Sequence, residues 1–80
     1  MTYSDVVGKR IAELCAERKI TPNKLATLAG LRQSTVNNLM QGDTKSPTLR
    51  TLHRLSIGLG ITVSELLDFP EMNETLFENE

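Results

Sequence analysis

The segment LAGLRQSTVNNLMQG, residues 28–42, concentrates side chains that form hydrogen bonds without titrating near neutral pH. They are Gln33, Ser34, Thr35, Asn37 and Asn38. An amide presents a donor beside an acceptor, and a hydroxyl can donate or accept. Such groups can match the edge of another polar molecule, and they are poor candidates for proton transfer.

A plain structural role is the alternative for this segment, because any surface helix needs a polar outer face. Ser, Thr and Asn are, however, poorer helix formers than Glu, Lys or Gln, which would solvate a helix at lower cost. The composition therefore favours a function other than helix formation.

The remaining reactive side chains do not form a catalytic or metal-binding set. No Ser, Cys or carboxylate is spaced to form a relay with His53, the single histidine. One histidine with one cysteine, Cys15, cannot build a zinc site, and the five glycines are too scattered to cradle a phosphate. We therefore expect a protein that is not an enzyme and has no metal, cofactor or small-molecule ligand.

Length and composition are those of one small globular domain. The chain has 80 residues, of which 39% are hydrophobic and 24% charged. No run approaches the roughly 18 apolar residues of a membrane span. The first twenty residues include several charged side chains, unlike a signal peptide. We expect a cytoplasmic protein without a membrane segment.

Charge is divided along the chain although the formal net charge is −1. Residues 1–54 carry all nine Lys and Arg residues and four of the ten acids, whereas residues 55–80 carry six acids and no base. This asymmetry favours a basic working surface with an acidic end directed elsewhere. An incidentally acidic C-terminal tail is the simpler alternative.

Helix breakers and apolar spacing predict an all-α fold of five short helices. The first begins at Ser4 as N-cap and is slightly weakened by Gly8, and the second begins at the Thr21–Pro22 pair. The fifth begins at a capping box in the segment TVSE, residues 62–65. We expect helices over about residues 4–18, 22–29, 33–40, 48–59 and 62–67.

The apolar residues at helical spacing define the predicted core. They are Val7, Ile11, Leu14, Cys15, Leu25, Ala26, Ala29, Val36, Leu39, Met40, Leu49, Leu52, Leu55 and Leu59. If Val36, Leu39 and Met40 point inward, the polar residues Ser34, Asn37, Asn38 and Gln41 face away from the core. Two short helices joined by a turn at Gly30, the second with a polar outer face, describe a helix-turn-helix unit that places its second helix in the DNA major groove.

The sequence resembles the lambda-repressor-like DNA-binding family of the Cro and XRE type. The likeness spans about residues 7–67 and includes NKLATLAGLRQSTVNNLMQG and SPTLRTLHRLSIGLGITVSELL. It is carried by Leu25, Ala26, Gly30, the triplet 34–36, Gly42, Pro47, Leu59 and Gly60.

The resemblance implies roles for particular side chains. Gln33, Ser34 and Asn38 fall where members of the family read base edges, with Thr35 and Asn37 flanking. Backbone phosphates are contacted in this family at the positions of Thr21, Asn23, Thr44, Lys45 and Ser46. Helix N-termini favour phosphate there too.

Three departures from the family pattern affect this assignment. Pro22 replaces a glutamine that commonly reaches a phosphate. Arg32 stands where a Ser or Thr N-cap is usual, which leaves its guanidinium available to a phosphate or a guanine. Cys15 and Met40 replace an Arg–Glu pair, and an apolar pair can do so at little cost.

The sequence therefore predicts a DNA-binding transcriptional regulator, a repressor that binds a two-fold operator on double-stranded DNA as a homodimer. Residues 1–69 are the expected DNA-binding domain, and residues 70–80 an acidic tail that is mobile or docks on a second subunit. The expected dimer surface comprises Leu66, Leu67, Phe69, Leu76 and Phe77. The alternative is an antitoxin-like or phage accessory module that mainly binds another protein.

Overall fold

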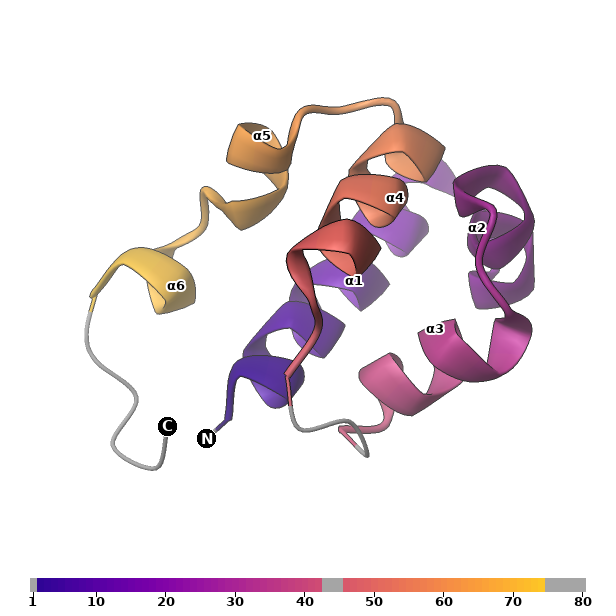
Figure 1. Ribbon diagram of the computed structural model, residues 1–80. Helices are drawn as coiled ribbons and strands as arrows, with labels where there is room; N and C mark the ends of the chain where they lie inside the picture. The colour runs from indigo at the N-terminus through magenta and orange to yellow at the C-terminus, as the bar shows by residue number, and fades with distance from the viewer. Residues whose placement is uncertain (1, 43–45, 75–80) are drawn as a thin grey trace.

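Six helices follow one another in the computed structural model, which describes residues 2–42 and 46–74 (Figure 1). They are α1 (Tyr3–Arg18), α2 (Pro22–Ala29), α3 (Gln33–Met40), α4 (Leu49–Leu59), α5 (Val63–Leu67) and α6 (Pro70–Glu74). The all-α prediction is confirmed. The count of five was one too low, because residues 70–74 of the predicted tail form a helix.

Threonine caps the N-termini of α1, α2, α4 and α5 by accepting a backbone N–H at the third helical position. The caps at Thr21 and Thr62 are as predicted. The predicted cap at Ser4 is wrong, because Thr2 is the N-cap and forms a capping box with Asp5. The Thr2 hydroxyl oxygen accepts the N–H of Asp5, and the Asp5 carboxylate accepts the N–H of Thr2. Ser4 lies buried in the first turn instead.

One apolar core joins the first five helices. Its fully buried side chains include Ile11, Leu25, Val36, Leu39, Leu55 and Leu66. Cys15 is buried with them, and Met40 is partly buried against them. Leu49 was wrongly placed in this core and is 71% exposed, because it is the first residue of α4 and lies at the edge of the apolar arc.

Small residues allow the helices to approach closely at two crossings. A Cβ added at Gly8 in α1 would stand 2.5 Å from the carbonyl oxygen of Leu39 in α3. A Cβ added at Gly58 in α4 would stand 3.0 Å from the Cβ of Ala29 in α2. These glycines therefore set the distances of α3 from α1 and of α2 from α4.

Two arginines of α1 stabilise the C-terminal half of the fold. Arg10 donates from Nε to the carbonyl oxygen of Leu66 at 3.1 Å, and its guanidinium lies 5.3 Å from the ring centroid of Phe69. Arg18 donates from Nε to the carbonyl oxygen of Leu59 at 3.0 Å. Both contacts place a cation at the C-terminus of a helix, where the helix dipole favours it.

The predicted dimer surface is wrong for two of its residues. Leu66 is fully buried and Phe69 is 7% exposed, because both pack into the core of the same chain. Leu67 is partly buried against that core. The calls on Leu76 and Phe77 lie outside the described residues.

The C-terminal helices lie apart from α2 and α3. In Figure 1, α5 and α6 occupy one side of the molecule and α2 and α3 the other, with α1 and α4 between them. An exposed ion pair of 3.2 Å between Lys9 of α1 and Glu71 joins α6 to the body. Across the described ranges, no helix combines the length and apolarity needed to cross a membrane.

Candidate nucleic-acid interface

The turn between α2 and α3 fixes the relative direction of the two helices. Gly30 has φ +70°, a left-handed conformation that glycine adopts without a Cβ penalty. Its N–H donates to the carbonyl oxygen of Thr27 at 3.2 Å, and the N–H of Leu31 donates to that of Ala26 at 2.9 Å. These bonds end α2 and direct the chain into α3 after three residues.

The inner face of α3 is anchored in the core, and its outer face is free. Val36 and Leu39 are buried. The outer face carries four exposed polar side chains, Gln33, Ser34, Asn37 and Asn38, in the orientation predicted. Three amides and a hydroxyl on one rigid face can form paired hydrogen bonds with a complementary polar edge.

Thr35 is placed differently from the other polar residues of α3. It is partly buried and lines two hollows that α3 shares with the beginning of α4, in both of which Thr48 and Thr51 also take part. Thr35 therefore borders α4, whereas the sequence predicts it as a residue that flanks the base-reading positions.

The predicted phosphate contacts are spread over the N-termini of α2 and α3 and the loop before α4. Thr21 is exposed, and its oxygen accepts the N–H of Lys24 at 3.0 Å, which leaves the hydroxyl proton available to a ligand. Asn23 and Ser46 are exposed. The calls on Thr44 and Lys45 lie outside the described residues.

Arg32 is the N-cap of α3 and makes no side-chain cap hydrogen bond. Its guanidinium is exposed, so the sequence inference that it stays available to a ligand agrees with its position. The first N–H groups of α3 therefore have no acceptor on the side chain of their N-cap residue.

Exposed cations lie on α2, at the α2–α3 turn and in the first half of α4. Lys24, Arg32, Arg50 and Arg54 are exposed, and none of them pairs with another described residue. Arg10 and Arg18 are engaged with backbone carbonyls instead. Charge patterning predicted a basic surface, but it could not separate these two structural arginines from the free ones, because their partners are more than 40 residues away.

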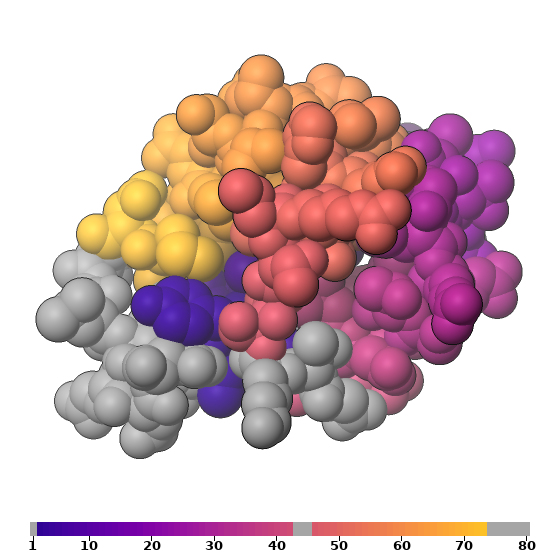
Figure 2. Space-filling view, in the orientation of Figure 1, coloured from indigo at the N-terminus to yellow at the C-terminus, as the bar shows by residue number. Residues whose placement is uncertain are grey.

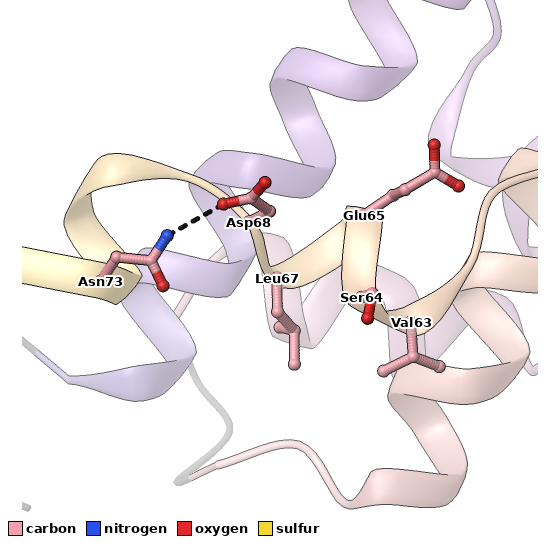
Figure 3. A pocket seen from close by; sticks show the side chains of 6 residues that line it. All are labelled: Val63, Ser64, Glu65, Leu67, Asp68 and Asn73. Carbon is pink, nitrogen blue, oxygen red and sulfur yellow. Dashed lines mark hydrogen bonds between the residues drawn. The ribbon is translucent and has the colours of Figure 1, made fainter.

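On the α5–α6 side of the molecule, a hollow has acidic residues in its lining (Figure 3). It lies between α5 and α6 and has a volume of about 590 Å³. Its lining includes Asp68 and Glu65, and the Glu65 carboxylate is turned to the N-terminus of α5, where it accepts the N–H of Thr62. The amide of Asn73 donates to Asp68 at 3.1 Å across it. The acidic lining would repel a polyanion, so a nucleic acid is better matched by the α2–α3 side.

Sequence comparison relates the chain to known regulators. The Cro/C1-type HTH DNA-binding domain family matches residues 10–71. The HTH-type transcriptional regulator PuuR of Escherichia coli (strain K12) is 33% identical over 64 residues, which is 80% of this chain and 34% of PuuR. The chain therefore spans about a third of the length of this curated relative.

Structural comparison gives the same result. The prophage Lp1 protein 11 matches with a TM-score of 0.83 and 41% identity, covering 94% of this chain and 99% of that one. The restriction-modification controller protein C.AhdI from Aeromonas hydrophila matches with a TM-score of 0.72 and 28% identity, covering 79% and 94%. The resemblance seen in the sequence is confirmed. The chain belongs to the Cro/C1-type helix-turn-helix DNA-binding domain family.

Proposed function

We propose that this chain is a sequence-specific transcriptional repressor that binds a two-fold operator as a homodimer, with α3 in the major groove. The observation that carries the proposal is the outer face of α3. Four exposed polar side chains stand on a helix anchored by Val36 and Leu39, and the exposed Arg32 and Arg50 line a cleft next to that helix.

Base reading follows from the chemistry of that face. Gln33, Asn37 and Asn38 can each present an amide to the N6 and N7 edge of adenine, and the hydroxyl of Ser34 can serve either base type. Thr35 keeps a flanking role, because it borders α4. Short side chains allow the helix to lie close to the groove floor.

Phosphate contacts hold α3 in register without reading sequence. We assign them to Thr21, Asn23, Arg32, Thr44, Lys45 and Ser46. The exposure of Thr21, Asn23, Arg32 and Ser46 supports this assignment. The same contacts make binding depend on salt, because each neutralised phosphate releases counterions.

Dimer formation would supply the contacts that one small module lacks. A single module buries only about 600–1,000 Å² on DNA, and two copies one helical turn apart double that area. Leu66 and Phe69 belong to the core of the same chain, so they are not available to a second copy. The strongly exposed apolar side chains of α4, Leu49 and Ile57, are available to it.

The test is a selection of bound duplexes from a random pool, followed by titration of the best duplex against salt. We expect one enriched two-fold sequence and a log affinity that falls linearly with log salt. Lys45→Ala should weaken all duplexes alike and reduce the slope by about 0.9. Lys9→Ala is the matched control, because Lys9 pairs with Glu71 on the α6 side.

Two results would contradict the proposal. If no duplex is enriched, the repressor function is contradicted, and the result favours the alternative of a module that mainly binds another protein. If light scattering of the selected complex gives one chain per duplex, the homodimer is wrong while DNA binding itself stands.

A further inference from the structure

A cleft lies between the α2–α3 turn and the beginning of α4, beside the outer face of α3. Its volume is about 350 Å³, and its lining includes Arg32, Arg50 and the side chains of Thr35, Thr48 and Thr51. In Figure 2 the beginning of α4 (red) borders the surface of α2 and α3 (magenta) on the face turned to the viewer. None of the residues that line this cleft is acidic.

Positive charge converges on the cleft from two elements. Arg32 comes from the turn before α3 and Arg50 from the first turn of α4, and within the described ranges neither pairs with an acid. Arg54 lies one turn beyond Arg50, and a Cβ added at Gly30 would stand 3.1 Å from its Nη1 atom. Like charges four residues apart on a helix repel each other, and an anion in the cleft would relieve this repulsion.

Hydroxyl protons complete the donor set. Thr48 accepts the N–H of Thr51 and donates its hydroxyl proton to Oγ1 of Thr51, each at 3.1 Å. The hydroxyl proton of Thr51 is therefore free to donate to a ligand. The cleft offers guanidinium and hydroxyl donors and no carboxylate, which is the chemistry that binds a phosphate group.

We infer that this cleft binds one phosphate group of the DNA backbone, with Arg50 as its principal ligand. The inference rests on the proposed function. It adds a phosphate contact from α4, to which no contact with DNA has been assigned above. Because Arg32 and Thr35 belong to α3 and its N-cap while Arg50 belongs to α4, a phosphate held among them fixes the two helices on the duplex together.

The first experiment compares duplex binding of Arg50→Gln with that of Lys9→Gln, using the full chain and a selected duplex. Both variants lose one positive charge, but Lys9 lies on the α6 side. Arg50→Gln should weaken binding roughly tenfold, the loss expected for one hydrogen bond to a charged group, and lower the salt slope by about 0.9. Equal, small losses in the two variants would overturn the inference. Circular dichroism checks that both variants are folded.

The second experiment locates the phosphate. Duplexes with a single neutral methylphosphonate at successive backbone positions are titrated against the wild-type chain and Arg50→Gln. We expect one position at which neutralisation weakens the wild-type chain but has no further effect on the variant. If the two effects add at every position, Arg50 contacts no backbone phosphate and the inference fails.

A third experiment separates a backbone phosphate from a free anion. Inorganic phosphate is titrated at constant ionic strength while amide resonances of Gly30, Thr48 and Thr51 are followed by NMR.

Shifts that Arg50→Gln abolishes, together with the single sensitive position in the duplex, support the inference. The same shifts without a sensitive position identify a free-anion site and overturn the assignment to DNA. Absence of shifts overturns the anion site whether or not DNA binds. Failure of the wild-type chain to bind any selected duplex instead contradicts the proposed function, and the phosphate titration still decides whether the cleft binds an anion.

Discussion

Replacement of Gly8 by alanine tests whether the contact between α1 and α3 sets the position of α3. The added Cβ would stand 2.5 Å from the carbonyl oxygen of Leu39, whereas ordinary contacts begin at 3.4 Å. The obstacle is backbone, so no side chain can rotate away. The two helices have to separate by about an ångström, and α3 moves away from the helix that supports it.

Two opposing effects set the expected magnitude. Overpacking of a close contact costs about 1–3 kcal/mol, and a backbone obstacle puts Gly8→Ala toward the upper end. Alanine also gains about 1 kcal/mol of helix propensity over glycine inside α1. The net loss should be about 1–2 kcal/mol of unfolding free energy, which corresponds to a decrease in Tm of roughly 4–16 °C for a domain of this size.

Urea unfolding followed by circular dichroism measures this loss. Ala12→Gly at an exposed site of the same helix serves as the control, because it measures the propensity term without any contact. Affinity for the selected duplex should fall as well, since α3 is displaced. If Gly8→Ala stabilises the chain by as much as Ala12→Gly destabilises it, the close approach of α1 and α3 is refuted.

Two further predictions concern titration and reactivity. The backbone N–H and hydroxyl of Thr62 donate to the Glu65 carboxylate and hold its pKa below the ordinary 4.5. These hydrogen bonds therefore stabilise the fold above pH 4.5, and their contribution is lost as the pH falls through the lowered pKa. Glu65→Gln should therefore lower the Tm at neutral pH, and its difference from the wild-type chain should vanish in acid; a constant difference would contradict this. Burial raises the pKa of the Cys15 thiol, so a disulfide reagent should react slowly with the folded chain and rapidly in denaturant. Equal rates in both conditions would show that the thiol is accessible.

The helix-turn-helix could be predicted because its boundaries are set by local chemistry. Thr21 and Pro22 start α2, and Gly30 ends it in a left-handed conformation. The alternation of Val36 and Leu39 with polar residues then orients α3. Each of these signals lies within a few residues of the feature that it determines, so no knowledge of distant contacts was needed.

Features that depend on distant contacts were missed or misplaced. The role of Gly8 is decided by Leu39, and the burial of Phe69 by its packing into the core beneath Arg10. The helix at residues 70–74 is packed against the body and joined to it by the ion pair of Glu71. The cleft around Arg50 could not be predicted for the same reason, since its walls come from segments about 18 residues apart in the sequence.

The central claim is that the outer face of α3 reads bases, and Gln33→Ala tests it most directly. Gln33 is exposed and lies at the first position of α3, so its truncation should leave the fold and the proposed phosphate contacts intact. Duplexes selected by the variant should match those selected by the wild-type chain except for a relaxed preference at one base position in each half-site. An unchanged preference at every position, or an equal loss of affinity for all duplexes, would contradict the assignment of this face to base recognition.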